Sequence, residues 1–375
     1  MLRPLVALLL ATGAPPQEPA APPPPTAIIG YVFPQERLLA PAEIDAAKLT
    51  HVNYAFANVR DGRLAPGFAR EAENLRVLTG LRAAHPQLRI LVSVGGWTWS
   101  KGFSGLALTA EGRLGFCESA IAYLRRHDLD GIDVDWEYPG LPGDGNPHRP
   151  EDRSSFTALM TELRSHLDRE AIRNGRRYWL TFAAGAFPDY LAHTEMEKVQ
   201  AVVDYVNLMT YDFRVPGAEP LAGHHANLLP HPADKRPLSV RRAVDDFLAA
   251  GVPAGKLVVG VPFYGRAWEA EGEYGPLYQP GKAPASFPGS SYSALRDLPG
   301  QGGWLRLWDD AAQAPWLWNP AKRLFVSYED PRSLRLKCRL VRDRGLGGVM
   351  FWEYSADPAG ELLGTLYDEL RARVR

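Results

Sequence analysis

Eight short apolar segments, rich in β-branched and aromatic residues, recur along this chain, and most of the intervals between them have helical periodicity. The segments are 27–33, 51–57, 90–94, 131–135, 178–183, 204–209, 257–262 and 347–352. Strands that alternate with helices pair in parallel, and eight such units close into a (β/α)8 barrel, the TIM barrel. The sequence therefore predicts an α/β fold whose functional side chains lie at the carboxyl ends of the strands.

The seventh interval is much longer than the others. More than eighty residues separate Pro262 from Gly347, and they are dense in aromatic residues and glycine without a long helical period. A structureless loop of this length is uncommon in a compact domain. Residues 269–326 are therefore predicted to form a small β-rich insertion subdomain of α+β type between strand 7 and the last barrel unit, where it would form one wall of a cleft. One elaborated barrel is expected to span residues 27–375.

The first 26 residues have a different composition from the rest. One arginine precedes an apolar run from Leu5 to Ala11, and small residues follow. This pattern is typical of a secretory signal, here predicted over residues 1–14, and the run is too short to span a bilayer. Residues 15–26 are rich in proline and predict an extended linker. We expect export to the periplasm or the medium, the alternative being a disordered cytoplasmic leader.

Charge and cysteine content exclude several classes of function. Lys and Arg number 42 against 43 Asp and Glu, so no net field attracts the chain to nucleic acid or to an anionic membrane. Two cysteines, Cys117 and Cys338, are too few for a disulfide scaffold, and two free buried thiols are preferred over one bridge. His224 and His225 are adjacent and lack a metal-binding spacing, which favours a loop role. We expect a monomer with no metal and no cofactor.

The fourth predicted strand contains an unusual run of acids, in the segment DGIDVDWEYPG at 130–140. Side chains alternate across a strand, so Asp133, Asp135 and Glu137 share one face and form a column with Glu137 nearest the open end. Closely spaced buried carboxylates cannot all ionise, so some share protons, and a raised pKa suits Glu137 as a general acid. The alternative of a calcium loop fits poorly, because such loops place their oxygens on turns. Asp130 is out of phase and is expected to be structural.

These residues resemble family 18 glycoside hydrolases, the chitinases and their relatives. The acidic segment is similar to the family pattern D-x-x-D-x-D-x-E, and four further segments resemble its other strand motifs in the same order. Those segments are LVSVGGWTW at 91–99, NLMTYDF at 207–213, GVPFYGRAW at 260–268 and GLGGVMFWEYSAD at 345–357. The resemblance runs from about residue 28 to about residue 363 and includes the insertion.

The resemblance implies substrate-assisted catalysis, in which the acetamide of the substrate is the nucleophile. By this resemblance Glu137 protonates the glycosidic oxygen, while Asp135 orients the acetamide N–H and shares a proton with Asp133. Tyr211 holds the acetamide oxygen.

The resemblance also implies a set of substrate contacts. Trp352 would be the aromatic floor under the sugar, or alternatively a core residue, and Tyr31 and Phe56 would close the base of the pocket unless they belong to the core. The remaining predicted contacts are Trp97, Tyr138, Met209, Asp212, Tyr264 and Arg266. Gly95 and Gly96 would allow a close turn beneath the substrate. The insertion tryptophans 304, 308, 316 and 318 could extend a sugar platform, although a local core is preferred.

The function implied by the resemblance is hydrolysis of β-1,4-linked N-acetylglucosamine polymers, most simply chitin. The alternatives are a related hydrolase of peptidoglycan or N-glycans and a non-catalytic chitin-binding lectin. The lectin is disfavoured because both Glu137 and Asp135 are present. Endo or exo action is left open.

Overall fold

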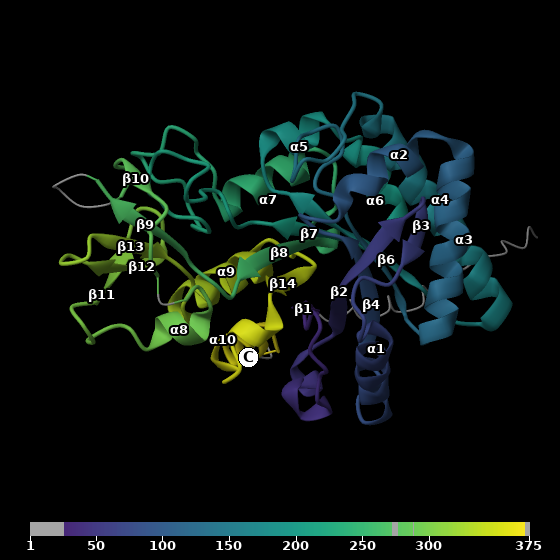
Figure 1. Cartoon of the computed structure of the whole chain (residues 1–375), viewed down its shortest axis with the longest axis horizontal. Coiled ribbons are helices and arrows are strands. Elements are labelled where there is room, and N and C mark those ends of the chain that lie inside the picture. Colours follow the sequence, from purple (N-terminus) through teal and green to yellow (C-terminus); the bar gives the residue numbers. More distant parts are fainter. Residues whose placement is uncertain (1–25, 272–276, 288, 372–375) are drawn as a thin grey trace, which may run out of the picture.

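A computed structural model describes residues 26–271, 277–287 and 289–371 (Figure 1). The predicted export signal, and the predicted linker apart from residue 26, lie outside the described residues. None of the helices in the described part of the chain is both long enough and apolar enough to cross a bilayer.

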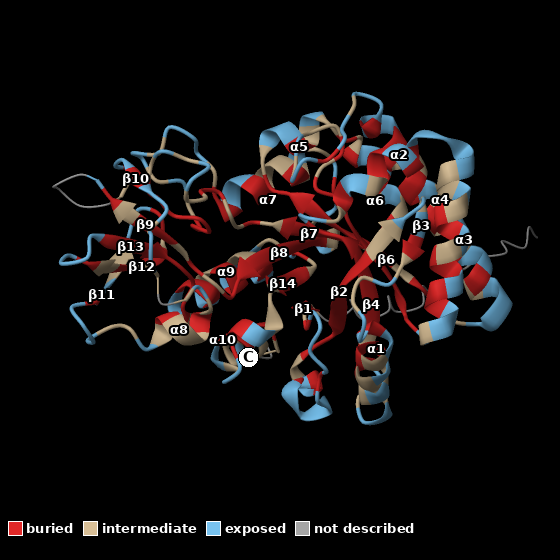
Figure 2. Ribbon diagram, in the orientation of Figure 1, coloured by how far each residue is buried: buried red, intermediate tan, exposed pale blue. Residues whose placement is uncertain are grey.

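Eight parallel strands form a closed barrel, as the sequence predicts. The order is β1-β14-β8-β7-β6-β5-β4-β2, and pairing of β1 with β2 closes it. The strands are β1 (Ala27–Val32), β2 (His51–Arg60), β4 (Arg89–Gly95), β5 (Gly131–Asp135), β6 (Trp179–Gly185), β7 (Tyr205–Met209), β8 (Leu257–Pro262) and β14 (Gly348–Trp352). Strands buried on both faces have continuous apolar sequences, and Figure 2 shows the barrel strands as buried along most of their length.

One hairpin on the barrel was not predicted. Strand β2 continues past the barrel to Arg60 and pairs with β3 (Arg63–Ala65) in antiparallel register. Asp61 and Gly62 form the turn with φ of 50° and 70°, the left-handed geometry of a two-residue hairpin loop.

Helices follow the barrel strands and surround them, apart from α8 (Tyr292–Arg296), which lies in the long seventh interval. They are α1 (Glu71–Gly80), α2 (Phe103–Leu108), α3 (Ala110–His127), α4 (Asp152–Asn174), α5 (Pro188–Ala192), α6 (Met196–Val202), α7 (Val240–Ala249), α8 (Tyr292–Arg296), α9 (Pro331–Asp343) and α10 (Glu361–Arg371). Local signals set their ends: Thr109 caps α3 by accepting from Gly112 N, and Asp330 caps α9 reciprocally with Ser333. Cys117 in α3 and Cys338 in α9 are buried and free, as preferred from the sequence.

The long seventh interval contains a second sheet, which Figure 1 shows at the opposite end of the molecule from α3 and α4. Its five antiparallel strands have the order β10-β9-β13-β12-β11. They are β9 (Arg266–Ala270), β10 (Gly281–Lys282), β11 (Leu305–Asp309), β12 (Ala314–Asn319) and β13 (Leu324–Ser327). The sheet begins three residues before the predicted start at 269, because β9 starts at Arg266, and ends one residue after the predicted end at 326.

The insertion tryptophans serve mainly as packing residues. Trp304 is buried, Trp316 and Trp318 pack on a cluster that contains Trp268 and Phe325, and Trp308 lies under the Arg332 guanidinium at 3.7 Å. These contacts agree with the preferred prediction of a local core.

Candidate active site

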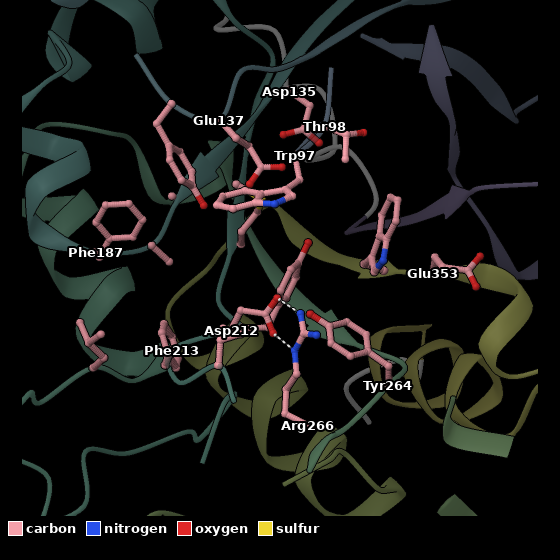
Figure 3. A pocket seen from close by; sticks show the side chains of 18 of the residues that line it. Trp97, Thr98, Asp135, Glu137, Phe187, Asp212, Phe213, Tyr264, Arg266 and Glu353 are labelled. Atoms are coloured by element: carbon pink, nitrogen blue, oxygen red, sulfur yellow. Dashed lines mark hydrogen bonds and ion pairs between the residues drawn. The ribbon is translucent and has the colours of Figure 1, made fainter. Parts of the chain in front are cut away.

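A cavity of about 1430 Å³ opens at the carboxyl ends of the barrel strands. Its walls combine aromatic side chains with a few charged groups, which Figure 3 shows from close by. Small-molecule sites usually measure about 300–1,000 Å³. The larger volume indicates a site for an extended ligand.

The deepest acid of the column, Asp133, lies beneath the cavity in the barrel interior and does not line it. Its Oδ2 accepts from the Tyr31 hydroxyl at 2.9 Å and from Ser93 Oγ at 2.7 Å. Its Oδ1 accepts from Thr181 Oγ1 at 2.5 Å and Asn207 Nδ2 at 3.1 Å. Burial raises the pKa of Asp133, and these four donors oppose that rise by stabilising the ionised form.

Above it, Asp135 and Glu137 line the cavity and are both buried. Burial is the main cause that raises the pKa of Asp135, and the charges of Glu137 and Asp133 raise it further. Burial also raises the pKa of Glu137 to about 7, against a hydrogen bond from Tyr138 that lowers it, and Asp212 adds a further increase. Asp135 Oδ1 has no hydrogen-bond partner among the described residues. The raised pKa values favour the protonated forms of this pair, and Asp135 Oδ1 is free to accept a hydrogen bond from a ligand.

The backbone around the acids is held by Ser100 and two glycines. Ser100 Oγ accepts from Glu137 N at 2.9 Å and donates to Asp135 O at 3.0 Å. Gly95 has φ of +111°, and a Cβ there would lie 2.3 Å from Asp135 O; Gly96 has φ of +80°, and its Cβ would meet the Phe56 ring at 2.8 Å. Only glycine fits at these two positions. The predicted tight turn at Gly95 and Gly96 therefore packs directly against the backbone of Asp135.

Asp212 is on the other side of the cavity, in the loop after β7, with φ of +56°. Arg266, the first residue of β9, bonds both of its oxygens, at 2.8 and 2.6 Å. His225 Nδ1 lies 3.3 Å from Asp212 Oδ1. Although burial opposes it, hydrogen bonds from His225 and Arg266 hold the pKa of Asp212 well below its usual value. Figure 3 shows the two bonds between Asp212 and Arg266, with Glu137 above them in this view.

Aromatic side chains form the floor and one rim of the cavity. Trp352, at the end of β14, stacks on Phe56 with ring centroids 5.4 Å apart and an angle of 17°. Trp97 is 50% exposed and meets Tyr138 edge-on at 6.4 Å. Burial is the main cause that keeps the pKa of Tyr211 well above its usual value, so its hydroxyl stays protonated and available as a donor.

Most of the residues predicted from the sequence meet in this cavity. Those that line it are Phe56, Trp97, Asp135, Glu137, Tyr138, Met209, Tyr211, Asp212, Tyr264, Arg266 and Trp352. Two do not. Tyr31 was predicted as a substrate contact or a core residue, and the core alternative holds: it is 2% exposed and donates to Asp133 below the floor. Asp133 is likewise beneath the cavity.

The sequence did not predict the residues contributed by loops. Those that line the cavity include Phe33, Phe68, Trp99, Phe187, Asp189, Glu219, Lys235, Arg236 and Glu353. Phe33 is the last residue of the predicted strand 27–33, Glu353 directly follows the predicted strand 347–352, and Trp99 ends the segment LVSVGGWTW, so these three positions were the available signal. The insertion tryptophans are not among the lining residues.

Within the ranges that the structure describes, no three or more His, Cys, Asp or Glu residues are grouped to hold a metal ion. The adjacent histidines point to different partners: His224 Nε2 is 3.0 Å from Asp309 of the insertion, and His225 faces Asp212. Asp130 is at the base of the barrel, where it pairs with Arg82 and Arg176 at 3.0 and 2.7 Å.

Comparison with known families accounts for this arrangement of acids and aromatic residues. A model of glycosyl hydrolases family 18 matches residues 27–357. The chain belongs to this family. The match extends from the start of β1 past the end of β14, and so covers the whole barrel with its insertion.

This family 18 hydrolase has similar relatives of known structure. A family 18 N-acetylglucosaminidase from Paenibacillus barengoltzii superposes with a TM-score of 0.83 at 40% identity, over 92% of this chain and 99% of that one. Chitinase ChiA74 from Bacillus thuringiensis superposes with a TM-score of 0.86 at 33% identity, over 93% of this chain and 70% of that one. Chitinase A1 of Niallia circulans is 37% identical over an alignment 378 positions long, which covers 84% of this chain and 54% of that protein. The chain thus spans about half the length of that relative.

Proposed function

We propose that this hydrolase cleaves β-1,4-linked N-acetylglucosamine polymers, with chitin or its oligosaccharides as substrate and Glu137 as general acid and base. The observation that carries the proposal is the pair of buried acids on the cavity floor: Glu137 with a pKa raised to about 7, beside Asp135 with an unpartnered Oδ1. A general acid works best when its pKa is near the working pH. The chitinase names of relatives support the choice of substrate.

In the first step, Glu137 transfers its proton to the glycosidic oxygen, and the bond from that oxygen to the anomeric carbon breaks. The acetamide carbonyl of the same sugar attacks the anomeric carbon and forms an oxazolinium ion. In the second step, Glu137 accepts a proton from water, and the water oxygen displaces the acetamide oxygen at the anomeric carbon. Two inversions at one carbon give retention of configuration.

Three other carboxylates of the cavity are held by protein partners, which favours the acetamide of the substrate as the nucleophile. Asp212 is bound by Arg266 through both oxygens, Glu219 pairs with Arg236 at 2.5 Å, and Glu353 accepts from the hydroxyl and N–H of Ser355. A carboxylate held by such partners is a weak nucleophile, because attack would require it to lose those hydrogen bonds. The acetamide carbonyl of the substrate could attack without the loss of hydrogen bonds to these partners.

The remaining polar groups would stabilise the cation. The free Oδ1 of Asp135 would accept the acetamide N–H, and the protonated Tyr211 would donate to the acetamide oxygen. Donors and charges fixed in a buried site stabilise developing charge without reorganisation. The Trp352 ring would stack on the apolar face of the sugar.

The location of the protein outside the cytoplasm is proposed from the N-terminal sequence alone. Residues 1–14 have the composition of an export signal, and an insoluble extracellular polymer requires an exported enzyme. Detection of the chain in the culture medium or periplasm of an expressing cell, with its N-terminus processed, would test this.

The decisive assay is turnover of a fluorogenic chitobioside by the wild type and by Glu137→Gln. The variant keeps the volume but cannot donate a proton, so kcat should fall by about 10²–10⁴-fold or more while oligosaccharide binding is retained. Glu118→Gln on the exposed face of α3 removes the same charge far from the cavity and should leave kcat unchanged. Near-native turnover by Glu137→Gln would refute the assignment.

The products will distinguish two modes of cleavage. The Paenibacillus barengoltzii relative is described as an N-acetylglucosaminidase, whereas others are described as chitinases. Release of single sugars from chitin oligomers would indicate the first mode, and release of disaccharides or longer fragments the second. Activity on muramyl glycans or glycoproteins but not on chitin oligomers would contradict the proposed substrate.

A further inference from the structure

His225 is a buried residue that contacts the active site without lining it. Its side chain is fully buried, and Nδ1 approaches Asp212 Oδ1 at 3.3 Å. Asp212 lines the cavity, whereas His225 lies behind it. The other ring nitrogen, Nε2, has no partner among the described residues. The side chain therefore has one polar contact that can be identified, and that contact is a carboxylate of the active site.

The backbone around His225 is fixed from three directions. His225 N donates to Ser327 Oγ of β13 at 3.0 Å, and its carbonyl accepts from Phe213 N at 3.0 Å. The next carbonyl, that of Ala226, accepts from Lys337 Nζ of α9 at 2.7 Å. The backbone at His225 is thus held by the insertion sheet, the loop after β7 and helix α9 together, which limits how far the ring can move from Asp212.

The charged and titratable groups facing the ring come from every element packed against it. They are Asp212 from the loop after β7, Tyr264 and Arg266 near the start of the insertion, and Lys337 from α9. Burial is the main cause that lowers the pKa of His225, Asp212 opposes this, and Arg266 and Lys337 lower it further. The ring is therefore neutral at neutral pH. Because an ionised carboxylate can only accept, the hydrogen is on Nδ1 and is donated to Asp212.

Two residues thus donate to Asp212, and both reach Oδ1: Arg266 Nε at 2.8 Å and His225 Nδ1 at 3.3 Å. Arg266 also binds Oδ2 at 2.6 Å, and Figure 3 shows its two bonds to the carboxylate. His225 supplies a neutral donor that fixes Asp212 without adding a charge. The negative charge of Asp212 contributes to the raised pKa of Glu137, so the position of this carboxylate matters for the proton on the acid.

We propose that His225 is a positioning residue that, together with Arg266, fixes the orientation of the Asp212 carboxylate in the cavity that it shares with Glu137. This proposal rests on the proposed function of Glu137 as the general acid. Without the imidazole, Asp212 Oδ1 keeps only its bond to Arg266, the carboxylate leaves the orientation in which its charge raises the pKa of Glu137, and the acid loses its proton at a lower pH.

The test compares His225→Leu, which removes the donor, with His225→Asn, whose amide N–H can occupy the place of Nδ1–H. In the leucine variant we expect kcat to fall by about 10- to 100-fold, the range produced by small misplacement of a reacting group. KM should change less, because His225 does not line the cavity. The basic limb of the kcat/KM profile should move down by up to about one pH unit. The asparagine variant should restore kcat and the limb to near the wild-type values.

A matched control is the neighbouring histidine. His224 is equally buried but faces Asp309 of the insertion, so His224→Leu should lower stability without moving the basic limb. If His225→Leu does not fold, His225→Met gives another side chain without a donor. The proposal would be overturned if the basic limb of the kcat/KM profile does not move in the folded leucine or methionine variant. It would also be overturned if the asparagine variant is as impaired as the leucine variant.

Failure of the proposed function can be distinguished from failure of this inference. A wild type that does not hydrolyse the chitobioside refutes the proposed function. Crystal structures of the wild type and His225→Leu do not depend on turnover, and they should show a changed orientation of the Asp212 carboxylate in the variant. An unchanged Asp212 orientation would refute the positioning role whatever the enzyme hydrolyses.

Discussion

Asp133 is the acceptor for four buried donors, and its replacement tests how the barrel interior is stabilised. Asp133→Ala removes both oxygens that accept from Tyr31, Ser93, Thr181 and Asn207. All four donors are almost fully buried, and an unsatisfied buried donor costs about 1–3 kcal/mol. The free energy of unfolding should therefore fall by about 4 kcal/mol or more, which is at the upper end for a point substitution.

Asp133→Asn should lower the free energy of unfolding by less than Asp133→Ala, because the amide keeps some of the hydrogen bonds. The amide oxygen can still accept from Thr181 and Asn207, while the amide nitrogen faces the hydroxyls of Tyr31 and Ser93. A hydroxyl can rotate to accept as well as donate. The expected loss of unfolding free energy is about 1 kcal/mol, the net value of a single hydrogen bond.

Urea unfolding followed by tryptophan fluorescence measures both losses, provided that the variants unfold in one transition with the m-value of the wild type. The reasoning predicts an alanine variant several-fold more destabilised than the asparagine variant. Equal losses in the two variants, or a loss below about 1 kcal/mol for alanine, would show that the four donors do not depend on Asp133.

Two further predictions concern buried charges. Because burial raises the pKa of Glu137 from its usual 4.5 to about 7, its bound proton stabilises the fold fully below about pH 4.5, and this contribution, about 3 kcal/mol, is lost as the pH rises through 7. Urea unfolding at pH 4.5 and pH 8 should show this dependence in the wild type and lack it in Glu137→Gln; an identical dependence in both would contradict the assignment. Lys337→Met leaves Glu329 buried without its ion pair and should cost about 3–5 kcal/mol of unfolding free energy, whereas Lys337→Met combined with Glu329→Gln should recover much of it. A double variant as unstable as the single one would refute this account.

The barrel could be predicted from the sequence because its strands are buried on both faces, and most of them therefore have a nearly continuous apolar segment. Residues 257–262 match β8 at both ends, and β5 matches 131–135. The hairpin strand Arg63–Ala65 was missed because three residues give no periodicity. The pairing order of the insertion was also missed, since several short strands of similar composition admit many antiparallel orders.

The site could be predicted only where it lies on strand ends. Glu137 and Tyr211 each lie two residues past the end of a barrel strand, and Trp352 ends β14, so strand position places all three at the open end of the barrel. Loop residues such as Phe187 and Arg236 line the cavity because of how their loops fold back, which no local pattern encodes.

The contact between Asp212 and His225 joins residues thirteen positions apart in an irregular loop, so it could be recognised only from the structure. Tyr31 shows that a correctly predicted strand position can still leave the direction of a side chain open. Its position at a strand end was evident, but strand position alone did not show that its hydroxyl turns down to Asp133 instead of up to the cavity.

Side chains from three strands of the insertion sheet form hydrogen bonds with the loop after β7 of the barrel. Arg266 of β9 binds Asp212, Ser327 of β13 fixes the backbone of His225, and Asp309 of β11 binds His224. Transplanting this sheet onto another barrel, or excising it to obtain a minimal enzyme, would break all three attachments at once. The barrel and the insertion sheet should unfold together in one cooperative transition. Directed evolution of the cleft will therefore have to vary residues of both parts together.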